Sequence, residues 1–321
     1  MRKLMTYIAC IAGAAILAGT AQAGPAPTLE IEDFIGTIEV QTGDFSKISV
    51  IDADGASIDL DGNRIVINDE RSVRSLNCRY KNDDVLIGKR GGWFSSTRGF
   101  KSITTYPKVT IKAPANMHLI ISNSLVFGNV GDIGSGDIDI RSCGELKLGD
   151  INGPLDLNIS GSGDLVMGDA GRSDISISGA GDLKTGDLAS ADIDVSGAGD
   201  IEVGDIIGHA EIGSSGAGDI SIARIKGGLA YHGSGASDFD ADYVGGGDLS
   251  VRVSGSGDVR IDEGEVNTLY IKASGASGVR YGGSSVSAEA RASGAADITI
   301  NQPSGKLRTS DSAAGDVHVN Y

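Results

Sequence analysis

The sequence predicts an all-β fold whose C-terminal two-thirds forms a β-solenoid, built from coils of about 19 residues. Three observations predict it: a recurring Ser-Gly-x-Gly-Asp motif, apolar residues at fixed distances from that motif, and 49 glycines among 321 residues. Periods of this size are typical of solenoids, in which each coil buries its apolar side only against its neighbours.

The motif occurs in nine copies whose last positions are 18 to 20 residues apart. The complete copies end at Asp164, Asp182, Asp200, Asp219 and Asp258, and degenerate copies end at Asp238, Gly278, Asp297 and Asp316. Glycine allows the positive φ that a sharp corner requires. We therefore place the motif at the corners of the coils, where short Asp and Ser side chains cap backbone N–H groups.

Two columns of apolar residues accompany the motif. Directly after it stand Leu165, Leu183, Ile201, Ile220, Phe239, Val259, Val279, Ile298 and Val317. Seven residues before its last position stand Leu157, Ile175, Ile193, Ile212, Tyr231, Val251, Ile271, Ala290 and Thr309. Apolar and polar residues alternate around both columns, which indicates strands with one buried face. Stacked coils should therefore pair these residues into internal ladders.

The third motif position holds a small residue in each copy, for example Ser162, Ala180 and Ala198. We interpret this position as lining a narrow core. Cys143 occupies it in an early coil and is therefore expected to be buried. An oxidising compartment permits a disulfide between Cys143 and Cys78, with an inert buried thiol as the alternative.

Residues 1–23 are predicted to be a cleavable export signal. Arg2 and Lys3 precede an apolar run from Ile8 to Leu17, and Ala21-Gln22-Ala23 fits the small-x-small pattern of a signal peptidase site. An uncleaved anchor is the alternative, although the run is short and rich in Ala and Gly. We expect no integral membrane segment after cleavage, and a destination in the periplasm, on the outer cell surface or in the medium.

The charge of the chain argues against two classes of partner. Removal of Arg2 and Lys3 with the leader takes the formal net charge from −16 to −18. Such a chain repels nucleic acid and anionic lipid, so neither is expected as a partner. The four histidines are scattered and no metal-ligand spacing occurs, so we assign no metal, no cofactor and no catalytic residue.

Residues 24–114 are predicted to form a less regular β region that caps the repetitive solenoid of residues 115–321. A long interruption at about residues 70–107 contains the only patch rich in both basic and aromatic residues in an otherwise acidic protein. Long loops on rigid scaffolds often carry function. We predict that this loop binds a ligand or partner through Arg90, Trp93, Phe94, Arg98 and Phe100. A solvated excursion is the alternative.

The repeated Ser-Gly-Ser-Gly-Asp coils, preceded by Phe34-Ile35-Gly36-Thr37-Ile38-Glu39-Val40, resemble the head GIN domain of auto-transporter adhesins. The resemblance covers residues 28–321. It implies a right-handed parallel β-helix, export and a role at the bacterial surface. It supplies no catalytic residues to transfer.

We therefore expect an exported, non-enzymatic binding or structural module of the cell envelope, adhesin-like, whose partner is a glycan or an envelope protein. The alternative is an envelope carbohydrate-active enzyme on a β-helix, which needs convergent carboxylates in a cleft. Calcium binding at the acidic corners is a further alternative, although the spacing differs from that of calcium-binding β-rolls. The sequence leaves the oligomeric state open.

Overall fold

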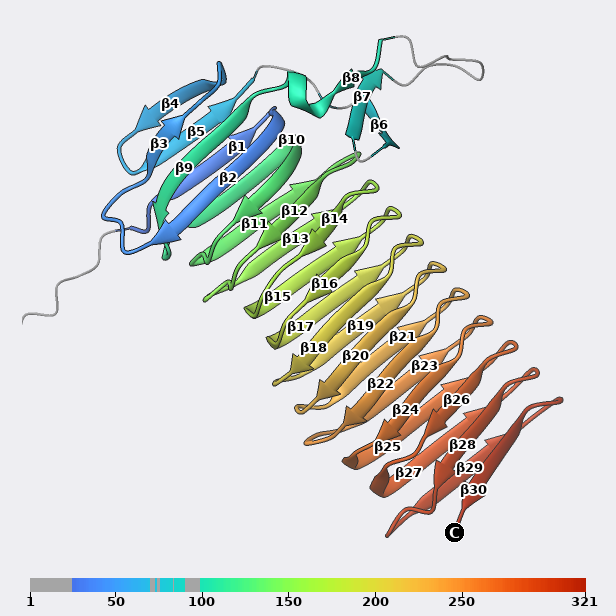
Figure 1. Cartoon of the computed structure of the whole chain (residues 1–321). Helices are drawn as coiled ribbons and strands as arrows, with labels where there is room; N and C mark the ends of the chain where they lie inside the picture. Colours follow the sequence, from blue (N-terminus) through green and yellow to red (C-terminus); the bar gives the residue numbers. More distant parts are fainter. Residues whose placement is uncertain (1–24, 70–72, 74–75, 83, 90–98) are drawn as a thin grey trace, which may run out of the picture.

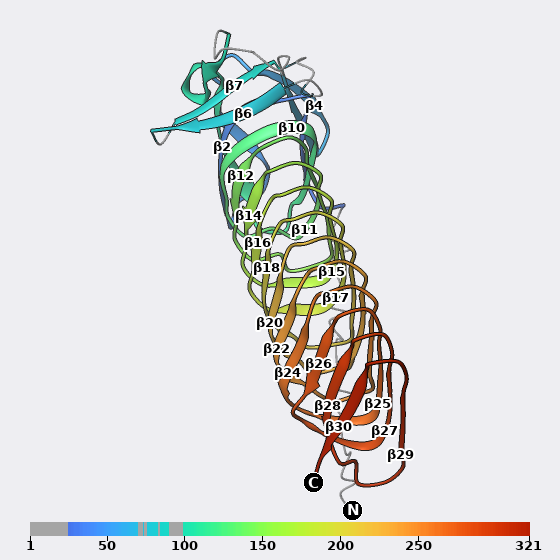
Figure 2. The same cartoon turned by 90° about the vertical axis from the view of Figure 1, so that its right-hand side faces the viewer.

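The computed structural model describes residues 25–69, 73, 76–82, 84–89 and 99–321. Strands dominate them, and their single helical element is a 3-10 turn at Ile103–Thr105. Figure 1 shows an elongated stack of coils, and Figure 2 shows that the coils enclose a common interior. The predicted all-β solenoid is thus confirmed. The described residues contain no helix with the length and apolarity needed to cross a bilayer.

Most strands belong to two long parallel faces that run along the solenoid axis. In spatial order, the first face contains β5 (Arg64–Asn68), β1 (Thr28–Glu32), the start of β10 (His118–Val130), β11 (Ser135–Ile140), β13 (Leu155–Ile159), β15 (Ala170–Ile177), β17 (Leu188–Val195), β19 (Ala210–Ser214), β21 (Leu229–Gly233), β23 (Leu249–Val253), β25 (Glu265–Ala273), β27 (Ser284–Ala292) and β29 (Leu307–Asp311).

The second face follows the same order, one strand per coil. It contains β9 (Lys108–Pro114), β2 (Ile35–Gly43), the end of β10, β12 (Glu145–Leu148), β14 (Asp164–Val166), β16 (Leu183–Thr185), β18 (Ile201–Ile206), β20 (Ile220–Ile225), β22 (Phe239–Val244), β24 (Val259–Glu263), β26 (Gly278–Tyr281), β28 (Asp297–Asn301) and β30 (Asp316–Asn320).

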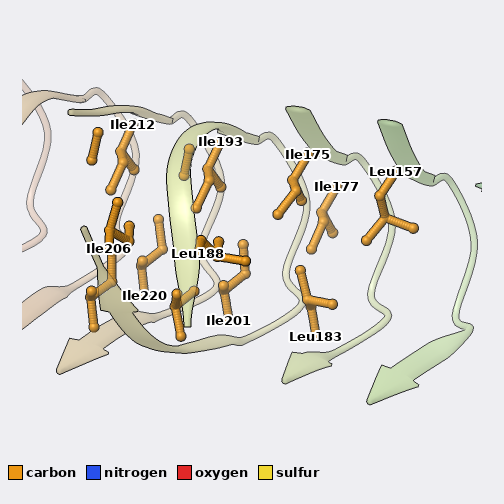
Figure 3. Close-up of a cluster of buried hydrophobic side chains, with 14 of the residues drawn as sticks. Leu157, Ile175, Ile177, Leu183, Leu188, Ile193, Ile201, Ile206, Ile212 and Ile220 are labelled. Carbon is orange, nitrogen blue, oxygen red and sulfur yellow. The ribbon is translucent and has the colours of Figure 1, made fainter. Parts of the chain in front are cut away.

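Both predicted apolar columns are confirmed, rung by rung. On the second face Leu183 pairs with Ile201, and Ile201 pairs with Ile220. Each of these three side chains is at most 2% exposed, and Figure 3 shows them in the solenoid interior. The first-face column pairs in the predicted register from Leu157 to Thr309. Burial of both columns supplies the main driving force for stacking the coils.

Each of the central coils also contributes a third apolar rung, which the sequence analysis did not single out. Leu188 pairs with Ile206, and Ile206 with Ile225, along the side that joins the second face to the next strand of the first. Figure 3 shows Leu188 and Ile206 directed into the interior that Ile201 also occupies. The core therefore has three apolar walls.

The small third position of the motif faces solvent, so its interpretation as a core position is wrong. Ala180, Ala198 and Ala217 are exposed, whereas the glycine that follows each of them is buried. A Cβ on Gly181 would lie 2.1 Å from the carbonyl oxygen of Gly163 in the preceding coil. The backbones of successive coils thus approach each other closely at these glycines, and the small residue lies at the outside of the corner.

The N-terminal end of the solenoid is assembled out of chain order. β1 and β2 lie between β10 on one side and β5 and β9 on the other (Figure 1). Two further strands, β3 (Ser49–Asp52) and β4 (Ser57–Asp61), pair antiparallel with β9 and β5. The parallel stacking therefore ends at these antiparallel strands, which occupy the outer edges of β5 and β9.

Replacing Ile201 by alanine should lower the free energy of unfolding by about 3 kcal/mol, because it leaves a cavity between two packed coils. Urea denaturation followed by circular dichroism measures this loss. Ser221 lies outward on the neighbouring β20 and is exposed, so Ser221→Ala serves as the control and should change stability little. Equal stability of the two variants would contradict the observed register.

Candidate binding surface

The aspartate that ends each of the first six motif copies accepts a hydrogen bond from the next coil. The Asp200 N–H donates to Asp182 Oδ1 at 2.9 Å, and the Asp219 N–H donates to Asp200 Oδ1 at 3.0 Å. The same ladder joins Asp164, Asp182, Asp200, Asp219, Asp238, Asp258 and the N–H of Gly278. The corner-capping role predicted for these aspartates is confirmed.

A second aspartate ladder follows another corner and was not identified from the sequence. Its members are Asp132, Asp150, Asp169, Asp187 and Asp205, each accepting from or donating to its neighbour. The signal was a Gly-Asp pair that recurs with the period of the coils. The most regular carboxylates of the chain therefore act as backbone acceptors between coils.

The chain segment between β5 and β9 forms a small antiparallel sheet outside the solenoid coils. It consists of β6 (Leu76–Lys81), β7 (Asp84–Lys89) and β8 (Lys101–Ser102), and Figure 2 shows β6 and β7 beside the N-terminal coils. Ile87 of this sheet packs with Leu125 and Phe127, which point outward from β10, in a second apolar cluster. The described part of the predicted loop therefore begins as a sheet packed on the solenoid wall.

Cys143 belongs to this second apolar cluster and forms a disulfide with Cys78 of β6, their Cα atoms lying 6.1 Å apart. Cys143 is 3% exposed, as expected, but for a different reason. It occupies the outward position of the motif, and the small sheet covers it. The bond ties the excursion covalently to the third motif position of an early coil.

The residues predicted to bind a ligand divide into two groups. Arg90, Trp93, Phe94 and Arg98 lie outside the described residues, and their role stays a prediction. Phe100 is half-buried, and its ring packs against Gly88: a Cβ added to Gly88 would lie only 2.7 Å from the ring. The Arg79 guanidinium stacks on the same ring at 4.9 Å. Phe100 thus packs on the small sheet.

The outward side of the first face carries an acidic column in the central coils. Its in-register rungs are Asp137, Asp156, Asp174, Asp192 and Glu211. Burial raises the pKa of Asp192, and the neighbouring charges of Asp174 and Glu211 raise it further. Burial and neighbouring carboxylates raise the pKa of Asp156 in the same way. Like charges on adjacent rungs repel each other, which makes this column a cost to the fold.

Farther along the same face the charge reverses. A neighbouring outward column contains His232, Arg252, Lys272 and Arg291, which pair on successive strands. The sequence analysis missed this column, although each member stands six residues before the last motif position. The first face therefore presents an acidic stretch followed by a basic stretch.

Of three comparisons with known proteins, the comparison with family models identifies the family of the chain. The family model described as "Putative auto-transporter adhesin, head GIN domain" matches residues 38–224 and 210–320. A crystal structure described as a "putative adhesin" from Bacteroides fragilis covers 92% of this chain and 92% of its own, with 14% sequence identity and a TM-score of 0.32. No curated protein matches the chain.

The Cys78–Cys143 bond should hold the small sheet on the solenoid without being required for the stacked coils. Reduction should therefore increase hydrogen exchange in β6 and β7, while the exchange of β17 to β20 stays unchanged. Alkylation of the unreduced protein under denaturing conditions should modify neither cysteine. Two alkylated cysteines would show that the bond is absent.

Removing one carboxylate from the corner ladder should destabilise the solenoid. Asp200→Ala leaves the N–H of Asp219 without its acceptor, which should cost about 1–2 kcal/mol in the free energy of unfolding. Asp200→Asn retains an acceptor oxygen and should recover most of that loss. Thermal and urea denaturation of the two variants measure the difference, and an equal loss in both would argue against the hydrogen bond.

Asp192→Asn should raise the free energy of unfolding at neutral pH by about 0.5 kcal/mol, because it removes one charge from the acidic column. The folded state raises the pKa of Asp192, so its charged form destabilises the fold. The advantage of the variant should therefore shrink as the pH falls from neutral through the raised pKa toward the ordinary aspartate value. Urea denaturation across this pH range measures it, and a pH-independent difference would contradict the electrostatic origin.

Proposed function

The chain belongs to the family of auto-transporter adhesin head GIN domains, and on that premise we propose that it is an exported, non-enzymatic, adhesin-like binding module of the bacterial cell envelope. The observation that carries the proposal is the outward surface of the first face. There the coils present polar side chains in register, one rung per strand, on a scaffold whose interior is closed by apolar columns. A rigid periodic surface of this kind suits an extended partner, a glycan or an envelope protein.

Two features support export to the periplasm, the outer surface or the medium. Residues 1–23 have the pattern of a cleavable signal and lie outside the described residues. The Cys78–Cys143 bond joins β6 to the corner between β11 and β12, and such structural disulfides persist in oxidising compartments.

The use of the carboxylates favours a binding module over the alternative of a carbohydrate-active enzyme. A glycosidase needs two carboxylates free to act on a glycosidic bond from a cleft. The regularly repeated aspartates at both corners accept backbone hydrogen bonds between coils.

Incubation of purified residues 24–321 with cell envelopes of the producing bacterium tests both readings. Co-sedimentation of the protein with envelopes, without release of soluble sugars, is the expected result. Release of reducing sugars that follows protein concentration would favour the enzyme. For export, N-terminal sequencing of the protein produced from its full gene should begin at Gly24. A chain that retains residues 1–23 in the cytoplasm would contradict the proposed location.

A further inference from the structure

The basic column of the first face lines a groove of about 300 Å³. One side of it is formed by His232, Arg252 and Lys272, and the other by Ser234, Ser254 and Ser274, which stand two residues later on the same coils. We propose that this groove binds an anionic polysaccharide. The inference rests on the proposed function as a binding module and names the chemical class of its ligand.

The charge of the groove distinguishes it from four other hollows on the described surface, each of which is lined by at least one carboxylate. No carboxylate lines it, whereas the hollows beside β16 and β18, and beside β24 and β26, are lined by several aspartates. The motif aspartates of the same coils, Asp238 and Asp258, lie around the corner. There each accepts a hydrogen bond from a backbone N–H of the next coil. An anion in the groove therefore meets cations at contact distance, while most carboxylates of this acidic chain are screened by salt at longer range.

The two central cations are available to a ligand. Arg252 donates to Ser250 Oγ at 2.8 Å and stacks on the Tyr270 ring at 4.8 Å, so its guanidinium is held in place without a carboxylate. Within the described part of the chain, neither Arg252 nor Lys272 forms an ion pair, whereas Arg291 on the next rung is paired with Glu289. The groove thus contains fixed positive charge that the fold itself does not neutralise.

The shape and lining favour a sugar chain over other polyanions. Successive strands lie about 4.8 Å apart, so cations and hydroxyls repeat along the groove at a spacing that an extended polymer can follow. The hydroxyl row can donate to and accept from sugar hydroxyls. A single-stranded nucleic acid needs free aromatic faces for its bases, and the Tyr270 ring is covered by Arg252. An acidic peptide that adds as a strand needs unpaired backbone groups, which the interior of this face lacks.

The test uses the mature chain and three immobilised polymers: polygalacturonate, which carries carboxylates, dextran sulfate, which carries sulfates, and neutral dextran. The wild-type protein should bind at least one anionic polymer, more weakly as salt rises, and should not bind dextran. Arg252→Gln with Lys272→Gln should weaken binding about tenfold or more, because each lost charge-assisted contact is worth up to roughly a factor of ten. The two anionic polymers distinguish carboxylate from sulfate recognition.

The chain offers a matched control on the same two coils. Arg260 and Arg280 lie on β24 and β26 of the second face, in a hollow that also contains Asp238, Asp240 and Asp258. Arg260→Gln with Arg280→Gln changes the net charge by the same amount and should leave binding within about twofold. Lys272→Arg keeps the charge and should retain binding. Circular dichroism melting checks that every variant is folded, as expected for exposed positions.

Several results would overturn the proposal. They are equal weakening by the two double variants, equal binding of dextran, no binding of either anionic polymer, or tighter binding of single-stranded DNA than of the glycans. Envelope co-sedimentation with the same proteins separates this inference from the proposed function. A wild-type chain that binds envelopes but neither anionic polymer would leave the proposed function standing and reject the groove. Groove-dependent binding of an anionic polymer without envelope binding would support the groove and reject the proposed function.

Discussion

The close approach of backbones at the motif corner is the constraint on which the rest of the structure depends. A Cβ on Gly179 would lie 1.7 Å from the carbonyl oxygen of Gly161, and a Cβ on Gly197 would lie 1.8 Å from that of Gly179. A side chain at this position would collide with the backbone of the preceding coil, so glycine recurs there in each coil. This contact allows the Ala180 N–H to donate to Gly161 O at 2.8 Å, and it sets the spacing at which the strands pair.

Once the coils stack at that spacing, each position of the repeat becomes a column with one physical role. Inward positions must be apolar, because polar groups without partners are costly in a dry core. Corner aspartates satisfy backbone N–H groups of the next coil. Outward positions such as Asp192 and Arg252 need be neither apolar nor hydrogen-bond acceptors for the next coil. At these positions the sign of the charge changes along the solenoid axis. The fold thus confines variation to its outer surface.

The small sheet of β6 to β8 modifies this scheme at one place. It covers Leu125 and Phe127, which would otherwise expose apolar surface on the outside of an early coil. Cys143 stands where the later coils have an exposed alanine or serine, and its bond to Cys78 holds the sheet over these residues. The excursion is therefore part of the packed wall at its base, independent of any role for the residues beyond it.

The sequence by itself determined the period of the coils, both apolar columns and the capping role of the motif aspartates. A repeat carries this information locally, because a residue and its partner in the next coil occupy equivalent positions. The basic column from His232 to Arg291 is also present in the sequence, as a fixed distance of six residues before the last motif position.

Only the tertiary structure decided the contacts between segments that are not part of the repeat and the direction of the small motif residue. The insertion of β1 and β2 between β10 and the later strands β5 and β9 depends on pairings that no period predicts. The same holds for the burial of Cys143, which comes from a segment 65 residues away. The outward direction of Ala180 was also decided there, since small residues fit both a narrow core and an exposed corner. Contacts between unlike segments depend on three-dimensional packing, and the sequence pattern of one repeat contains no record of them.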